Sequence, residues 1–152
     1  MYRKPGGLLL IAVFSIAFVI FFSIISNQKP NLPNAIEVPQ CSLASKSITS
    51  GNQTSIIVTV KSNDEEHSHN IRIEFKSHEL VSFFQGSQIL PKKGGTWYYE
   101  YTIPSSTTHT EEINVVATLE SGISEYTYRI SVAVFSDGKQ FYDVNLDLSV
   151  KL

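Results

Sequence analysis

The sequence predicts an all-β protein: an antiparallel β-sandwich preceded by one transmembrane α-helix. The first observation behind this prediction is a single uninterrupted apolar run near the N-terminus. The second is that apolar residues recur at every second position after Cys41, which is the period of strands with one buried face. The third is the set of glycine, proline and polar breakers between these alternating runs. With 152 residues, the chain has room for one modest domain beside the helix.

The apolar run extends from Leu8 to Ile25, and Ser15 and Ser23 are its only polar side chains. At ~1.5 Å per residue, a helix of this length with its flanking residues nearly spans a ~30 Å hydrocarbon core. Basic residues precede the run, which favours a cytoplasmic N-terminus. We therefore expect residues 1–7 in the cytoplasm, a transmembrane helix at 8–26, a proline-rich tether at 27–40 and an extracytoplasmic sandwich at 41–152.

Two other fates of the apolar run stay open. A secretory signal would be cut near Ser26, but the run exceeds the usual ~7–15 residues of such signals and no Ala-x-Ala site follows it. The short basic stretch, Gly7 and the apolar run resemble the type IV pilin-like signals of archaeal surface proteins. That resemblance implies cleavage after Gly7 and a role in a surface filament. We expect a retained signal anchor, which leaves Met1 as the first residue.

Each expected strand has one apolar and one polar face. The last two strands flank Asp137-Gly138, and this dipeptide between alternating runs is the strongest short-range signal for a β-hairpin. About seven to nine short strands in roughly 110 residues, with no amphipathic helix among them, indicate a sandwich. The expected inward-facing residues are Ile56, Val58, Val60, Ile71, Ile73, Phe75, Trp97, Tyr99, Tyr101, Ile103, Ile113, Val115, Ala117, Leu119, Tyr126, Tyr128, Ile130, Val132, Val134, Tyr142, Val144, Leu146, Leu148 and Val150.

The stretch from Ser47 to Asn63 contains Gly51, then polar residues that include Thr54, then alternating apolar residues. This order resembles the opening strands of immunoglobulin-like adhesion modules in archaeal and bacterial envelope proteins. The resemblance covers residues 41–152 and implies an immunoglobulin-like sandwich in a cell-envelope protein. In size and layout the chain is also similar to the membrane-anchored β-sandwich stator of the archaeal motility filament, which we keep as an alternative. The Cys-Trp-Cys spacing of antibody domains is missing, since Cys41 is the single cysteine.

One loop carries residues that could hold a metal ion. Glu66, His67 and His69 lie in a polar segment between two expected strands. Histidines two residues apart on a strand project from one face, and with a neighbouring carboxylate they could ligate Zn²⁺ or Cu²⁺. This pattern predicts a metal-binding accessory domain as an alternative function. The competing interpretation is a solvated loop, which we favour, and we expect no cofactor.

Aromatic side chains predict a protein-binding surface. Trp97 and Tyr98 are neighbours on an aromatic strand, and Phe135 lies near the end of another strand. The outward-facing members of this set would form the apolar patch that marks a partner-binding face. The last strand of the terminal hairpin could also pair with a strand of another chain if it lies at a sheet edge, where Asp143 and Asp147 would guard against such pairing.

A single Asn-x-Ser/Thr tripeptide is present, at Asn52. It lies in an expected turn on the outer side of the membrane. Asn52 is therefore the candidate glycosylation site.

Composition and spacing argue against other classes of function. The pI of 6.1, with Lys+Arg 12 against Asp+Glu 14, lacks the basic footprint of nucleic-acid-binding domains, so we expect no nucleic acid among the partners. No Gly-x-Ser-x-Gly elbow is present, and Glu111 and Glu112 are interpreted as surface charges, so we expect no catalytic residues, no enzyme and no small-molecule substrate. The expected partners are membrane lipid, through the run from Leu8 to Ile25, and a protein. The predicted function is a non-catalytic binding or assembly subunit of an envelope or membrane complex.

Overall fold

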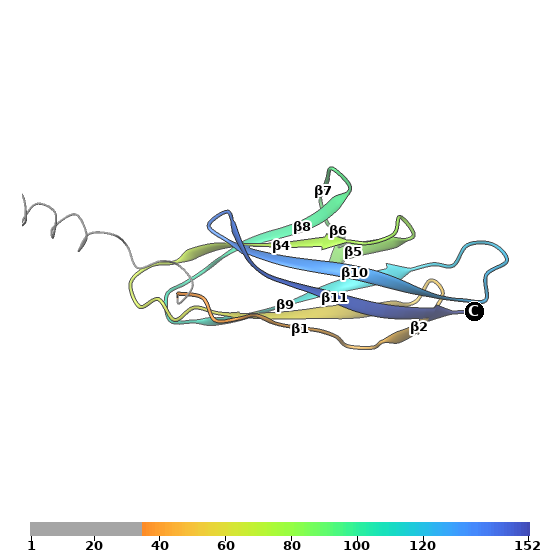
Figure 1. Cartoon of the computed structure of the whole chain (residues 1–152), viewed down its shortest axis with the longest axis horizontal. Coiled ribbons are helices and arrows are strands. Elements are labelled where there is room, and N and C mark those ends of the chain that lie inside the picture. The colour runs from red at the N-terminus through yellow and green to blue at the C-terminus, as the bar shows by residue number, and fades with distance from the viewer. Residues whose placement is uncertain (1–34) are drawn as a thin grey trace, which may run out of the picture. The chain divides into compact units, whose positions relative to one another are not determined.

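The computed structural model describes residues 35–152, which form two β-sheets that pack on one shared core (Figure 1). This part of the chain consists of strands, turns and loops and contains no helix, so the predicted all-β architecture is confirmed. Within these residues, accordingly, no helix is long and apolar enough to span a membrane. The predicted transmembrane helix at 8–26 and the segment at 1–7 lie outside the described residues.

Eleven strands make up the two sheets of the described part: β1 (Gln40–Leu43), β2 (Ser47–Thr49), β3 (Gln53–Lys61), β4 (His69–Lys76), β5 (Val81–Gln85), β6 (Gln88–Ile89), β7 (Lys92–Lys93), β8 (Thr96–Ile103), β9 (Thr108–Ala117), β10 (Glu125–Ser136) and β11 (Lys139–Lys151). One sheet has the order β1-β3-β9-β5-β6, and all its neighbouring strands are antiparallel. The other sheet has the order β2-β11-β10-β4-β8-β7.

The core lies between the two sheets and is built from every second residue of the longer strands. Phe75 of β4 and Phe83 of β5 come from opposite sheets, and their rings stack with centroids 5.1 Å apart. The predicted inward faces are confirmed, except that Tyr126 is 51% exposed. The largest fully buried side chains are Phe75, Phe83, Ile56, Ile71, Ile73, Ile103, Ile113, Ile130, Leu148, Val58, Val60 and Val81.

The first strand of the domain is divided between the two sheets. β1 runs antiparallel to β3, whereas β2, three residues further along, runs parallel to the end of β11 (Figure 1). The second sheet is therefore mixed, and the prediction of a purely antiparallel sandwich is wrong for this pair. Alternation of apolar residues assigns the faces of a strand, but it contains no information on the direction of a distant partner strand.

The β10–β11 hairpin forms the longest ladder of the domain, from Glu125 paired with Lys151 to Ser136 paired with Lys139. Its turn is the predicted Asp-Gly dipeptide, with φ of 50° at Asp137 and 80° at Gly138. Two successive residues with positive φ match the right-handed twist of the flanking strands. The predicted hairpin is thus confirmed.

Residues 35–40, which the sequence assigns to the end of the tether, contact the sandwich. Ile36 is only 5% exposed and pairs with Ser62 through an isolated β-bridge. The Glu37 backbone N–H donates to the Lys61 carbonyl at 2.9 Å, and the Lys61 ammonium lies 2.8 Å from the Glu37 carboxylate. The packed domain therefore begins before Cys41, because an apolar side chain at position 36 extends its core. The earlier part of the expected tether lies outside the described residues.

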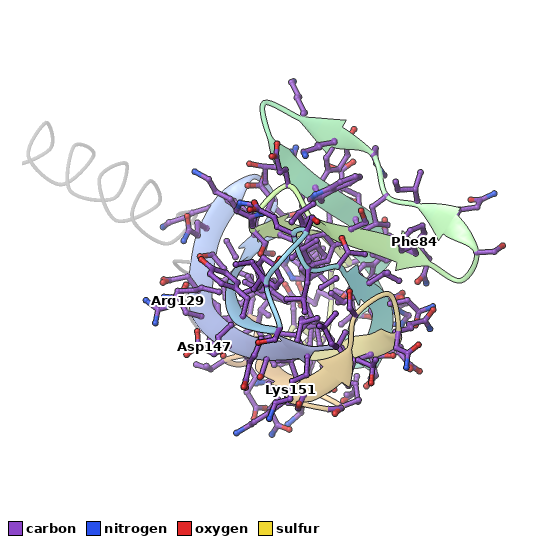
Figure 2. All side chains as sticks on the ribbon, turned by 90° about the vertical axis from the view of Figure 1, so that its right-hand side faces the viewer. Phe84, Arg129, Asp147 and Lys151 are labelled. Atoms are coloured by element: carbon purple, nitrogen blue, oxygen red, sulfur yellow. The ribbon has the colours of Figure 1, made fainter. Side chains whose placement is uncertain are left out.

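Adjacent phenylalanines offer a direct test of this core. Phe83 is fully buried, whereas Phe84 faces outward on the same strand (Figure 2). We expect Phe83→Ala to lower the free energy of unfolding by about 3–5 kcal/mol, because it leaves a cavity beside Phe75. Phe84→Ala should cost about 1 kcal/mol or less. Urea unfolding of the full chain measures both, and equal losses would contradict the assignment of faces.

Candidate functional site

His69 links two loops at one end of the sandwich. It is the first residue of β4 and is 5% exposed. Its Nδ1 lies 2.7 Å from an Asp137 carboxylate oxygen, and its Nε2 lies 3.1 Å from a carboxylate oxygen of Asp64. Both ring nitrogens therefore have a carboxylate oxygen as their partner in this arrangement. A metal ion could bind either nitrogen only by displacing one of these carboxylates.

Asp64 organises the loop between β3 and β4. One of its carboxylate oxygens accepts the backbone N–H groups of Glu66 and His67, at 2.9 and 3.0 Å. These two hydrogen bonds are the main reason that the pKa of Asp64 is lowered to about 2. Burial raises the pKa of Asp137, but hydrogen bonds from His69 and from the Asn70 N–H outweigh it, so that the pKa is lowered.

The predicted metal ligands are therefore not brought together. The His67 side chain is 62% exposed in the loop, whereas His69 is buried and already holds two carboxylates. Glu66 is exposed and contributes its backbone N–H to Asp64. Within residues 35–152 there is no group of three His, Cys, Asp or Glu side chains with the geometry of a metal site. The prediction assumed that both histidines lie on a strand, but β4 begins only at His69.

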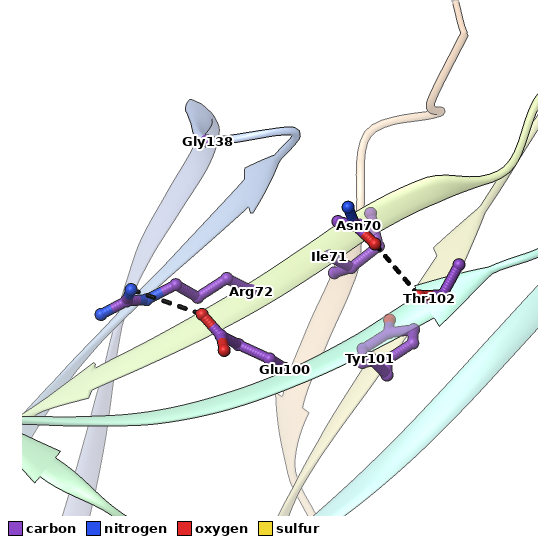
Figure 3. Close-up of a pocket in the computed structure, with 7 residues that line it drawn as sticks. All are labelled: Asn70, Ile71, Arg72, Glu100, Tyr101, Thr102 and Gly138. Carbon is purple, nitrogen blue, oxygen red and sulfur yellow. Dashed lines mark hydrogen bonds and ion pairs between the residues drawn. The ribbon is translucent and has the colours of Figure 1, made fainter.

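The outer face of the six-stranded sheet carries a shallow hollow of about 450 Å³ (Figure 3). Arg72 of β4 stacks over the Tyr98 ring of β8, with its guanidinium carbon 4.5 Å from the ring centroid. The same guanidinium lies 2.9 Å from Glu74 and 3.4 Å from Glu100. The hollow is lined by Asn70, Ile71, Arg72, Glu100, Tyr101, Thr102 and Gly138.

The three predicted partner-binding aromatics do not share a surface. Tyr98 and Phe135 both belong to the outer face, since Phe135 of β10 pairs with Arg72 in the strand register. Trp97 instead faces inward and packs against Phe83, with ring centroids 6.1 Å apart. Alternation along a strand makes this separation unavoidable for two adjacent residues. Trp97 is therefore an edge-of-core residue, and the two outward-facing rings are those of Tyr98 and Phe135, both half-buried.

The buried carboxylate of Glu111 forms hydrogen bonds with residues of both sheets, which the sequence pattern did not lead us to expect. Glu111 of β9 is 7% exposed. Its carboxylate accepts hydrogen bonds from Gln85 of β5 at 2.9 Å and from the Tyr99 hydroxyl of β8 at 3.2 Å, and it lies 2.6 Å from His109 Nε2. The interpretation of Glu111 as a surface charge is therefore wrong. The signal was available, because Glu111 has the same parity as the inward-facing Ile113.

Tyr101 completes this polar cluster. Its ring lies over His109, with centroids 4.5 Å apart, and its hydroxyl is buried without a hydrogen-bond partner among the described residues. Burial, followed by the charge of Glu111, raises the pKa of both Tyr99 and Tyr101. The cluster places hydrogen-bond donors from both sheets around one carboxylate and so links the two sheets.

Asn52 lies in the tight turn between β2 and β3. It is exposed, and its backbone N–H donates to the Thr49 carbonyl at 2.9 Å. The expected turn is therefore present at the candidate glycosylation site, and its side chain is accessible.

No protein-family model and no curated protein matches this sequence. Among solved structures, the alkylpurine DNA glycosylase AlkC from Pseudomonas fluorescens, bound to DNA containing an abasic site analogue, is similar with a TM-score of 0.47 and 8% identity. The match covers 78% of this chain but only 31% of the glycosylase, so the chain spans about a third of that protein's length. At this level the likeness concerns the fold alone.

The exclusion of nucleic acid from the partners is corrected. It rested on the pI of 6.1 alone. The pI reports the net charge of the whole chain, not the distribution of charge over one surface, so it does not rule out a class of partner. The likeness assigns no DNA binding to this chain.

The pKa of Asp64 predicts how the domain responds to acid. Since the folded value of about 2 lies below the ordinary 3.8, the ionised carboxylate stabilises the fold above pH 4, and this contribution is lost as the pH falls towards 2. Asp64→Asn lacks this titration, so the stability difference between wild type and variant should shrink over that range. Urea unfolding followed by Trp97 fluorescence measures it, and a constant difference from pH 5 to pH 2 would contradict the role of Asp64.

Proposed function

We propose that this chain is a non-catalytic, membrane-anchored assembly subunit. Residues 8–26 form a retained transmembrane helix, and the sandwich is an extracytoplasmic immunoglobulin-like domain that docks a protein partner in the cell envelope. The apolar run from Leu8 to Ile25 and the basic residues before it support the anchor and its orientation.

Strand order supports the immunoglobulin-like assignment. In such sandwiches one sheet has the order ABED and the other contains CFG, with an added C′ strand in variable-type domains. Strands β1-β3-β9-β5 correspond to ABED, and β8-β4-β10-β11 correspond to C′CFG. One departure is that β5, in the D position, precedes β8, in the C′ position, along the chain. The division of the first strand into β1 and β2 fits an A strand shared between both sheets.

A non-catalytic role is supported by the protonation state of the single cysteine, Cys41. Burial raises the pKa of the Cys41 thiol to about 11, so the thiol stays protonated at neutral pH. His69 and His109 both contact carboxylates that belong to the folded framework, namely Asp64, Asp137 and Glu111.

One observation supports a docking face on the outer side of the six-stranded sheet: Arg72 stacks on Tyr98 beside the hollow. Tyrosine and arginine are enriched at the energetic centres of protein interfaces. Phe135 adds a half-buried aromatic ring on the same face. Glu74 and Glu100 hold the guanidinium, so the side chain is oriented before a partner arrives.

Site-specific photo-crosslinking in native membranes tests this face. A photoreactive residue in place of Tyr98 should crosslink to one discrete protein. The matched control is Glu112, an exposed residue on the outer face of the other sheet, where little crosslinking is expected. Equal crosslinking at the two positions, or none at Tyr98, would overturn the proposed docking face.

The anchor has its own test, N-terminal sequencing of the mature protein. A retained signal anchor leaves Met1 as the first residue and the protein in the membrane fraction after alkaline carbonate washing. A first residue of Leu8 would indicate a pilin-like cut, and a start near Asn27 would indicate a secreted protein; either result contradicts the proposal.

A further inference from the structure

Among the described strands, β11 has one long edge without a partner. It pairs with β10 along its whole length, but β2 covers only Ser149 to Lys151 on the other side. Within residues 35–152, no strand pairs with the remaining edge of β11, from Lys139 to Leu148. The cause is the sheet change of the first strand, because β1 pairs with β3 instead of continuing along β11.

The backbone groups that face this open edge follow from the pairing with β2. The Ser149 N–H donates to the Lys46 carbonyl and the Lys151 carbonyl accepts from the Ser50 N–H, so odd-numbered residues point away from β10. In an antiparallel ladder this direction alternates from residue to residue. The N–H and carbonyl groups of Asp143, Asn145 and Asp147 therefore point outward, and they form no hydrogen bond with the rest of the described chain.

An apolar seam runs beside the open edge. Tyr142, Val144 and Leu146 face the core from β11 but remain half-buried. Cys41 and Leu43, also half-buried, face the core from β1 in the other sheet. A strand added to β11 would place its inward side chains over this seam. Burial of apolar surface is favourable, so such a strand would gain from apolar residues at alternate positions.

The outward side chains of the same stretch are acidic. Asp143 and Asp147 lie on the outer face, where Asp147 pairs with Arg129 at 3.1 Å and Asp143 has no ion pair among the described residues (Figure 2). An antiparallel pair of two β11 strands centred on Asn145 would place Asp143 opposite Asp147 of the second copy. Like charges directly opposite each other are destabilising. The edge therefore disfavours this self-pairing and favours a basic partner.

We propose that the β11 edge accepts an extended segment of a partner protein in which apolar side chains alternate with lysine or arginine. The apolar side chains cover the seam between β11 and β1, the basic side chains lie beside Asp143 and Asp147, and the partner backbone bonds to residues 143, 145 and 147. This is strand addition at a sheet edge, in which the backbone supplies affinity and alternate side chains supply specificity. It goes beyond the outer-face docking proposed above and uses different residues.

A fluorescent peptide of alternating valine and lysine tests the proposal on the full chain in zwitterionic micelles. Fluorescence anisotropy should show saturable binding. Asn145→Pro removes an outward N–H without removing a bond to β10, and its ring obstructs the edge. We expect this change to weaken binding about tenfold or more. The control is Asn145→Thr, which keeps the N–H and should bind like wild type. Equal binding by the two variants, or no binding by wild type, overturns the proposal.

Charge is tested separately with Asp143→Lys and with a peptide in which glutamate replaces lysine. The wild type should prefer the lysine peptide, and Asp143→Lys should reduce that preference severalfold. A preference that does not change would contradict the role of the acidic outer side chains. If the unliganded chain self-associates and Asn145→Pro abolishes this, the edge is occupied by a second copy and the proposal fails. None of these results depends on crosslinking at Tyr98.

Discussion

The passage of the first strand from one sheet to the other determines which parts of this domain stay uncovered. β1 hydrogen-bonds to β3 and forms one edge strand of the five-stranded sheet. Because β1 does not continue along β11, most of the β11 edge has no partner strand within residues 35–152. The stacked rings of Phe75 and Phe83 and the apolar residues around them hold the sheets together, so that this open edge is presented on a rigid frame. A preorganised edge binds at a lower entropic cost than a flexible loop.

Local patterns in the sequence predicted the features that are themselves local. The face of each long strand followed from alternation, and the β10–β11 turn followed from Asp137 and Gly138, whose positive φ few other residue pairs tolerate. Features that depend on residues far apart in the sequence were not predicted. The parallel pairing of β2 with β11 joins residues about a hundred positions apart in the sequence. The three residues of β2 do not specify the direction of so distant a partner strand.

The candidate sites show the same difference between local features, which the sequence predicts, and features that depend on the fold. His67 and His69 are two residues apart, but they share a face only if both lie on a strand, and the hydrogen bonds of Asp64 turn the chain before β4 begins. Glu111 was wrongly interpreted as a surface residue because of its charge. Its position in β9, two residues before the inward-facing Ile113, places it on the inward face. Partners from three strands compensate for its burial, and their convergence is a property of the folded domain that a linear reading does not contain.

Within residues 35–152, β11 packs its apolar side chains inward and has no partner strand along its edge from Lys139 to Leu148. Amide hydrogen exchange of the full chain, resolved by residue, tests this most directly. We expect the amides of Val144 and Leu146, which bond to β10, to exchange at least roughly a hundredfold more slowly than those of Asp143, Asn145 and Asp147. Equal protection of these five amides would show that the edge is already covered, and would contradict the account.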